Sequence, residues 1–267
     1  MVIPRGTGPV VGNILLRTHA IADKIPPMPL DICDADSQGG IGYMIAQCLG
    51  TALAEHNMSR EVAAVVTRVR VSRDDPAFRK PSKPIGPFYT QEEAGQRAER
   101  DGWAVREDSG RGWRRVVPSP LPQGILELEA IKTLLNAGLL VIAAGGGGVP
   151  VAVEPDGAQV GIEAVVDKDR ASALLASELG LSSFVIVTGV DYVAINFGKP
   201  DQQNLEQMTV AEAERYLAAG EFGEGSMKPK IESALQFLAA GGSDVLITSP
   251  EALSDALSGK SGTRIVR

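Results

Sequence analysis

Residues 139–150, LLVIAAGGGGVP, carry the strongest fold signal in the chain. A short continuous apolar run is typical of a strand that is buried on both faces of a parallel sheet. Four glycines, residues 145–148, follow at its carboxyl end, where ligands bind in open α/β sheets. We therefore expect their successive backbone N–H groups to be free to form a nest for an anion. The run is neither a Walker A loop nor a G-x-G-x-x-G fingerprint.

Helices and apolar strands alternate around this stretch. A short hairpin is expected at residues 151–165. Helix–strand pairs are expected at residues 125–138 with 139–145, 169–180 with 183–189, and 230–242 with 244–249. This alternation predicts an α/β fold with a mostly parallel sheet covered on both faces.

The first 71 residues show a weaker version of the same pattern. Residues 1–3 read as the end of a strand, and apolar spacing predicts helices at residues 10–24 and 37–57. Residues 62–71, VAAVVTRVRV, are rich in β-branched side chains and predict one strand.

Residues 70–122 differ in composition from the rest of the chain. They are rich in Arg, Lys, Pro and Gly and contain both tryptophans, which indicates a protruding lobe inserted into a single domain over residues 1–267. Thr90 followed by Glu93 forms a capping-box pattern and predicts a short helix at residues 90–102. A strand pair is expected around residues 104–107 and 113–118.

Composition excludes several classes of protein. A net charge of −7 without a long basic run argues against a nucleic-acid binder. No stretch approaches the length of a membrane span, and a signal-peptide core is missing, so we expect a cytoplasmic protein. Cys33 and Cys48 predict two buried, reduced thiols. With only His19 and His56, no metal site and no Ser-His-Asp hydrolase site is expected.

Two lysine clusters suit an anionic substrate. Lys168 lies between Asp167 and Asp169 at the start of a predicted helix, where an acid can orient the ammonium group. Lys228 and Lys230 open another helix, which is unfavourable for the helix dipole unless an anion lies nearby. The alternative for the first cluster is an N-cap Asp with solvated neighbours, and for the second it is surface lysines on a loop. Phosphoryl transfer relies on such fixed positive groups.

Two loops could complete such a site. Thr188, Asp191 and Tyr192 follow a predicted strand and suit a nucleotide base, although an ordinary loop is equally compatible. Gly6 and Gly8 precede a predicted helix and suit an anion, but only weakly.

These segments together resemble the motif series of carbamate kinases, within the amino-acid kinase family, in the same order and over nearly the whole chain. The segments are DICDADSQGGIGYMI (31–45), DDPAFRKPSKPIGPFYT (74–90), GRGWRRVVPSP (110–120), AAGGGGVPV (143–151), EAVVDKDRASALLA (163–176), VDYVAINFGKP (190–200) and GSMKPKIESA (225–234). The segments KPIGPFYT and GRGWRRVVPSP are specific to carbamate kinases within that family.

The resemblance implies an open αβα sandwich, a homodimer, and reversible transfer between ATP and carbamate that gives ADP and carbamoyl phosphate, with Mg²⁺. It implies that Lys168 and Lys230 contact the phosphates and that Asp169 orients them. The nucleotide would lie at Thr188, Asp191, Tyr192, Met227 and Lys230. The substrate would lie at Gly6, Gly8, Lys83, Gly145, Gly146 and Gly147, with Gly148 beside it.

The chain also departs from the family pattern. Carbamate kinases open with a strand and a Gly-Gly-Asn loop that this sequence does not contain, and Thr7 and Val10 replace an Asn and a Gln. Gly189 and Lys228 replace an acid and a glycine, and Arg5 adds positive charge. These departures leave two alternatives open: a non-catalytic or truncated relative, and a kinase for another small carboxylate.

Overall fold

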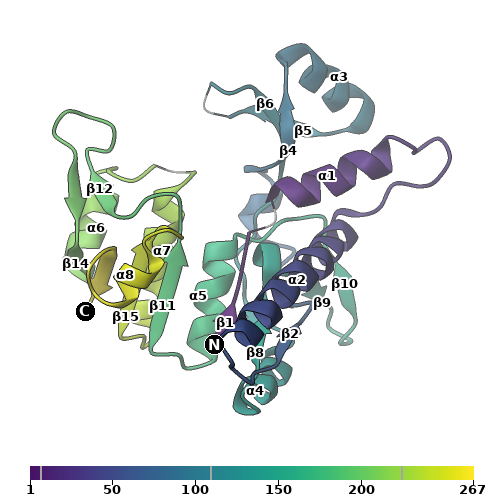
Figure 1. The fold of residues 1–267 in the computed structure, drawn as a ribbon. Coiled ribbons are helices and arrows are strands. Elements are labelled where there is room, and N and C mark those ends of the chain that lie inside the picture. The colour runs from purple at the N-terminus through teal and green to yellow at the C-terminus, as the bar shows by residue number, and fades with distance from the viewer. Residues whose placement is uncertain (7, 109, 224) are drawn as a thin grey trace. The chain divides into compact units, whose positions relative to one another are not determined.

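The computed structural model describes residues 1–6, 8–108, 110–223 and 225–267. The chain divides into two compact units, residues 1–172 and residues 173–267 (Figure 1). Helix α5 (Lys168–Glu178) contains the boundary between them. In the described part of the chain, every helix is too short or too polar to cross a membrane.

The first unit is built on two small sheets beside the long helix α2 (Leu30–Glu55). One sheet has the parallel order β1-β8-β2, with β1 Val2–Ile3, β8 Leu140–Ile142 and β2 Val62–Ala64. The other has the order β10-β9-β3-β7, with β10 Gln159–Gly161, β9 Val149–Val153, β3 Arg68–Arg70 and β7 Gly124–Ile125. Helix α2 packs on β2, β8 and β9, and α4 (Leu128–Asn136) packs on β8.

The start of α2 differs from the prediction. The helix begins at Leu30, after Pro29, and not at residue 37. In its first turns Asp34, Ser37 and Gln38 are buried beside the apolar Leu30 and Cys33. Because polar and apolar side chains share the inner face, the apolar period is interrupted and the first turns escape a hydrophobic pattern.

The strand expected at residues 62–71 is also different, because it is two strands, β2 and β3, in different sheets. The break falls at Thr67, whose backbone is bound by the side chain of Gln38. Gln38 Nε2 donates to Thr67 O at 3.1 Å, and Thr67 N donates to Gln38 Oε1 at 2.8 Å. Thr67 O also accepts from Val149 N of β9 at 2.8 Å, so Gln38 satisfies the backbone N–H of Thr67 where the chain leaves one sheet for the next.

The lobe is a three-stranded antiparallel sheet with one helix. Its order is β4-β6-β5, with β4 Lys83–Tyr89, β6 Trp113–Val117 and β5 Ala104–Glu107, and the helix is α3 (Gln91–Asp101). The predicted capping box of Thr90 and Glu93 is confirmed, with Thr90 Oγ1 accepting from Glu93 N at 3.2 Å. Strand β4 was not predicted, because two prolines interrupt it. Its place at a sheet edge tolerates them.

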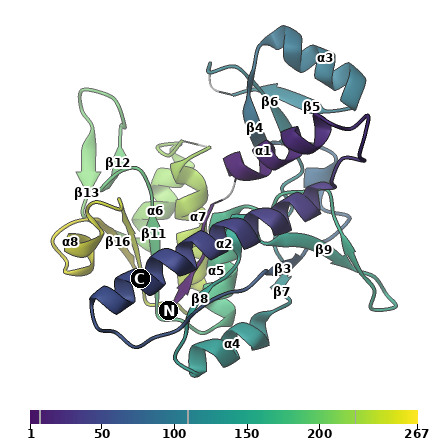
Figure 2. The same cartoon turned by 45° about the vertical axis from the view of Figure 1, so that its right-hand side comes forward.

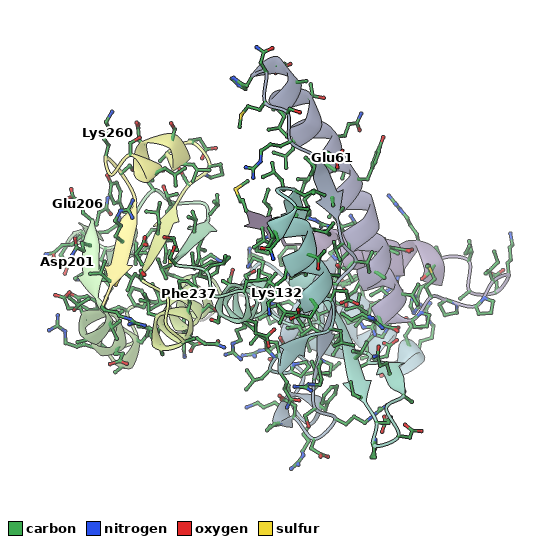
Figure 3. The ribbon with its side chains drawn as sticks, turned by 90° about the horizontal axis from the view of Figure 1, so that it is seen from below. Glu61, Lys132, Asp201, Glu206, Phe237 and Lys260 are labelled. Carbon is green, nitrogen blue, oxygen red and sulfur yellow. The ribbon has the colours of Figure 1, made fainter. Side chains whose placement is uncertain are left out.

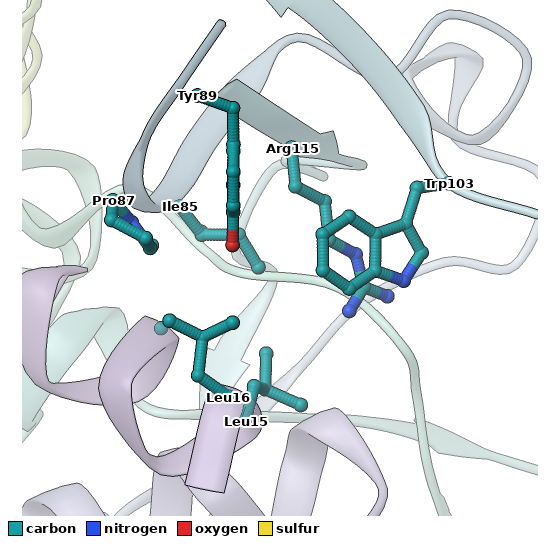
Figure 4. A pocket seen from close by; sticks show the side chains of 9 residues that line it. Leu15, Leu16, Ile85, Pro87, Tyr89, Trp103 and Arg115 are labelled. Carbon is teal, nitrogen blue, oxygen red and sulfur yellow. The ribbon is translucent and has the colours of Figure 1, made fainter. Parts of the chain in front are cut away.

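Helix α1 (Gly8–His19) lies against β4 of the lobe (Figure 2). It ends at His19, short of residue 24, before the chain reaches Pro26. A Cβ on Gly12 would lie only 2.0 Å from the Cα of Gly86, so the two backbones touch there. Beside this contact a small cavity is lined by Leu15, Tyr89, Trp103 and Arg115, among others, with the Arg115 guanidinium 4.9 Å from the Trp103 ring (Figure 4).

The second unit has one larger sheet and a hairpin. The sheet order is β11-β15-β16-β14, with β11 Ser183–Val187, β15 Asp244–Thr248, β16 Thr263–Val266 and β14 Gln207–Thr209. The hairpin is β12 Val193–Ile195 with β13 Gln203–Leu205, and the helices are α6 Val210–Ala218, α7 Met227–Ala239 and α8 Leu253–Leu257. Phe237 of α7 is fully buried in the core and lies 5.6 Å from the ring of Phe184 (Figure 3).

The two cysteines of α2 lie in different environments. Cys33 is buried, as predicted, but Cys48 is exposed, so the expectation of two buried thiols is wrong for Cys48. Cys48 faces outward because it lies on the outer side of α2, in a stretch where Gln47 and Gly50 are exposed as well.

One buried carboxyl group on α2 has an unsatisfied oxygen. Asp34 is 4% exposed, and its Oδ2 has no hydrogen-bond partner among the described residues. Burial, together with the charges of Asp31 and Glu163, raises the pKa of Asp34 well above its ordinary value. The folded protein therefore favours the protonated acid. Its contribution to stability is present below the unfolded pKa and is lost as pH rises through the folded pKa.

Replacing Asp34 by asparagine is accordingly expected to stabilise the protein at pH 7. The free energy of unfolding should rise by roughly 1–3 kcal/mol, because the neutral amide does not have to take up a proton on folding, as Asp34 does at this pH. The gain should disappear below about pH 4, where the acid is neutral in both states. Urea unfolding at the two pH values measures it, with Asp36→Asn on the exposed side of the same helix as control. An equal gain at both pH values would contradict this account.

Candidate functional site

The ionic group at the start of α5 is the centre of the candidate site in the first unit. Asp167 caps the helix, since its Oδ1 accepts from the backbone N–H of Asp169 at 2.9 Å. Its Oδ2 forms a salt bridge with Lys83 Nζ, from the first residue of β4. Lys168 Nζ lies 3.1 Å from Asp169 Oδ2. The structure thus brings three predicted residues, Lys83, Lys168 and Asp169, into one group around Asp167.

Asp167 was recognised in the sequence only as a neighbour of Lys168, and its pairing with Lys83 was missed. The two residues are 84 positions apart, and no local pattern connects them. Burial by itself raises the pKa of Asp167, but the charge and hydrogen bond of Lys83 and the charge of Lys168 lower it to about 2. The carboxylate is therefore ionised throughout the neutral range and holds the ammonium group of Lys83, while Lys168 pairs with Asp169.

Replacing Lys83 by methionine is expected to raise the pKa of Asp167, because burial then acts without its main opposing charge. In the wild type, the stability from this pair is present above the unfolded pKa and is lost as pH falls through about 2. Acid unfolding of Lys83→Met should therefore begin at higher pH. Carboxyl NMR titration of Asp167 measures the shift, with the exposed Lys80→Met as control. An unchanged titration of Asp167 would refute the pairing.

Gly6, which lies between β1 and α1, is directly against Lys168. A Cβ on Gly6 would lie 3.1 Å from Lys168 Cδ and 3.5 Å from Cε, so the absent side chain makes room for the lysine stem. Gly8 is the first residue of α1. Thr7, whose identity departs from the family pattern, lies outside the described residues. The structure therefore joins Gly6 to the α5 group through packing.

The glycine run after β8 corrects one expectation. Three of its backbone N–H groups are not free: Gly146 donates to Arg5 O at 2.7 Å, Gly147 to Ala144 O at 3.2 Å, and Gly148 to Gly145 O at 3.0 Å. The run forms a tight turn, with φ +69° at Gly146, +104° at Gly147 and +84° at Gly148, and these bonds close it. The prediction of an open nest of free N–H groups is therefore wrong for this conformation.

The glycines instead allow close backbone approach. A Cβ on Gly147 would lie 2.1 Å from Val166 O, which brings the run against the segment that precedes Asp167. Behind the run, Ala144 N donates to Thr67 Oγ1 at 2.9 Å. Thr67 is fully buried and, as described above, bound to Gln38. Thr67 and Gln38 support the run and were missed in the sequence, since buried polar residues leave no periodic signal.

A cavity of ≈ 360 Å³ lies in the second unit. Three predicted nucleotide residues line it: Thr188, Tyr192 and Met227. Asp191 is not among its lining residues. Lys230 is not among them either. The lining also includes Gly189, Val190, Ala194, Phe197 and Ser226, from the segments that the sequence pointed to, and Glu221, Phe222 and Gly223, which no sequence pattern indicated. Aromatic and aliphatic walls with a few polar groups are typical of a small-molecule site.

Lys230 occupies an inward position on α7 and is 8% exposed. A lysine this buried is uncommon unless its ammonium group has partners. Among the described residues, no group of three His, Cys, Asp or Glu side chains is arranged to hold a metal ion.

Comparisons with known proteins agree with these features. A model of the amino acid kinase family matches residues 43–249. The chain is 50% identical over 268 residues to a carbamate kinase of Staphylococcus haemolyticus, covering 99% of this chain and 86% of that protein. It is 48% identical over 269 residues to one of Thermococcus kodakarensis, covering 100% and 85%.

A solved structure supports the same relationship. Carbamate kinase from Giardia lamblia bound to AMP-PNP matches with a TM-score of 0.89 and 43% identity, covering 99% of this chain and 84% of that chain. This match confirms the predicted α/β fold class. Parallel pairing links β1, β8 and β2, β3 with β9, β11 with β15, and β14 with β16. Antiparallel pairing occurs in the lobe, in the two hairpins, between β3 and β7, and between β15 and β16.

Proposed function

This chain belongs to the amino acid kinase family and, within it, to the carbamate kinases, and we propose from that premise that it converts ATP and carbamate reversibly into ADP and carbamoyl phosphate. The observation that carries the proposal is identity of 48–50% to carbamate kinases over essentially the whole chain. In the direction of ATP formation, a β-phosphate oxygen of ADP attacks the phosphorus of carbamoyl phosphate. The bond from phosphorus to the carbamate oxygen breaks, and carbamate leaves with the electron pair.

The proposed roles follow from charge and position. Lys168, oriented by Asp169 at 3.1 Å, and Lys230 would stabilise the negative charge on the transferring phosphoryl group. Lys83 would lie at the carbamoyl group, held by its salt bridge to Asp167. Gly6, Gly8 and residues 145–147 would let the substrate approach the backbone. Because residues 146–148 use their N–H groups internally, we assign the run a shaping role in this conformation.

The nucleotide is proposed to bind in the cavity of the second unit. Its apolar walls, including Val190, Phe222 and Met227, suit a base, and Thr188 and Tyr192 offer hydroxyl groups. That the Giardia relative binds AMP-PNP supports nucleotide binding by this chain, and the cavity is proposed as its place from the lining residues. Mg²⁺ would arrive with the nucleotide, since this ion is usually held by phosphate oxygens, water and one or two carboxylates. It would neutralise charge on the phosphates.

We also propose a homodimer in the cytoplasm. Ile32, Tyr43 and Met44 are exposed large apolar residues of α2, at 43%, 65% and 53%. Ile32 and Tyr43 are eleven positions apart and share one face of the helix. Such a stripe is an ordinary place for a second copy of the chain to pack. Sedimentation velocity of the wild type and of Tyr43→Glu tests this, with a shift to monomer expected for the variant.

The function is tested by ATP formation from ADP, carbamoyl phosphate and Mg²⁺. The wild type is expected to form ATP, and Lys230→Met is expected to abolish this activity. Lys260→Met, at an exposed lysine, is the control. If no ATP forms, the proposal fails and a non-catalytic relative is indicated. If a panel of small carboxylates gives a higher kcat/KM than carbamate in the reverse reaction, the substrate assignment fails while the kinase assignment stands.

A further inference from the structure

Arg5 has an unusual environment for an arginine. Its Nη2 donates to two backbone carbonyls of α2, Ser37 O at 3.1 Å and Gln38 O at 2.6 Å. Its Nε and Nη1 are buried and have no hydrogen-bond partner among the described residues. Burial lowers the pKa of Arg5. The residue as a whole is partly buried, with Nη2 directed at α2.

Stability alone does not account for this arrangement. Ser37 O and Gln38 O lie within α2, where each can accept from the N–H group four residues further along the helix. Removing Arg5 would therefore leave no buried acceptor unpaired. In contrast, a buried guanidinium with unpaired N–H groups is costly. Replacing such a group by an apolar side chain of similar length is often neutral or stabilising.

Arg5 does connect three parts of the candidate site. Its backbone oxygen accepts from Gly146 N at 2.7 Å. Its guanidinium fills the space beside Gly145, where a Cβ would lie 3.0 Å from Nη2 and 3.1 Å from Cζ. The next residue, Gly6, lies against the stem of Lys168. A displacement of Arg5 would thus reach the glycine run and Lys168 together.

We propose that Arg5 is a positioning residue for phosphoryl transfer. Clamped to α2 by its guanidinium, it fixes the backbone of residues 5–6 and thereby sets both the glycine run and Lys168. It does not contact the substrate. This inference rests on the proposed function, because it assigns Lys168 to the reaction. A guanidinium suits the role since two N–H groups of one nitrogen reach neighbouring carbonyls in a fixed geometry.

The experiment compares Arg5→Met, which keeps length and removes the fork, with Arg5→Lys, which keeps charge. Arg60→Met is the matched control, because Arg60 also donates to a backbone carbonyl, Gly138 O at 3.2 Å, but is exposed. For Arg5→Met we expect kcat to fall by about 100-fold, the loss typical of a small misplacement of reacting groups. KM for carbamoyl phosphate and Tm should stay near the wild-type values, and Arg5→Lys should recover part of kcat.

Hydrogen–deuterium exchange gives a readout that does not depend on activity. Exchange at residues 143–149 should be faster in Arg5→Met than in the wild type and unchanged in Arg60→Met. Unchanged exchange in Arg5→Met would overturn the proposal even if the wild type proves inactive. A rise in KM for carbamoyl phosphate with kcat preserved would overturn it in favour of a substrate ligand. A fall in kcat that only follows a fall in Tm would overturn it in favour of a purely structural residue.

Discussion

Lys168→Met is expected to lower kcat by roughly 100- to 1,000-fold, the loss typical of removing one fixed group that stabilises transition-state charge. Lys168 Nζ lies 3.1 Å from Asp169 Oδ2 and belongs to the ionic group that includes Asp167 and Lys83. The side chain is 39% exposed, so methionine fits without opening a cavity, and the cost to folding is limited to the partner that the buried Asp169 loses. Folding should therefore be preserved while phosphoryl transfer is lost.

The matched control is Lys132→Met on α4. Lys132 is 37% exposed and also pairs with a carboxylate, Glu129 at 2.8 Å (Figure 3). Steady-state kinetics with ADP and carbamoyl phosphate, together with Tm, separates the two variants. If Lys168→Met retains activity within about twofold of Lys132→Met, a difference of less than roughly 0.5 kcal/mol in barrier, the assignment of Lys168 is wrong.

Gly147→Ala is expected to have the second large effect, on stability and activity together. Its Cβ would lie 2.1 Å from Val166 O, a backbone atom that cannot move without moving Asp167. The residue also has φ +104°, which a side chain rarely adopts. Overpacking and backbone strain together should lower the free energy of unfolding by roughly 2–5 kcal/mol. Any protein that folds should have a much lower kcat, because Asp167 holds Lys83.

Gly138→Ala separates the two causes. Gly138 also has positive φ, +90°, but a Cβ there would meet nothing within 4 Å. Backbone strain without a clash should cost only about 1 kcal/mol and leave kcat unchanged. Urea unfolding and kinetics of both variants measure the difference. Equal losses in the two proteins would show that the close approach at Val166 has no consequence.

The sequence predicts most strongly where apolar character is local and continuous. Strands β8, β11 and β15 and helices α5 and α7 follow from runs or periods of apolar residues that each element carries by itself. Helix α3 follows from its capping box, which is local chemistry. The weaker parts are those whose partners are distant in the chain. Thr67 divides a β-branched run because Gln38 binds its backbone, and no pattern near residue 67 reveals this.

In the candidate site, too, the sequence predicts the local features and misses the pairings between distant residues. Lys168 and Asp169 were predicted as neighbours, and their side chains do meet. Tyr192 follows a strand and lines the cavity, as a loop aromatic can. The pairing of Lys83 with Asp167 and the clamp of Arg5 on α2 join segments that are dozens of residues apart. They depend on tertiary packing, which residue type and spacing do not encode in a readable form.

The contact between Gly12 and Gly86 has an evolutionary consequence. A side chain at position 12 would strike the backbone of β4, whereas position 86 needs glycine for its φ of +71°. Either substitution alone forces α1 and the lobe apart or strains the strand, and neither can compensate for the other. Each position should therefore stay glycine whatever occupies the other. A relative with the same α1–β4 contact that carries a larger residue at either of them would contradict this constraint.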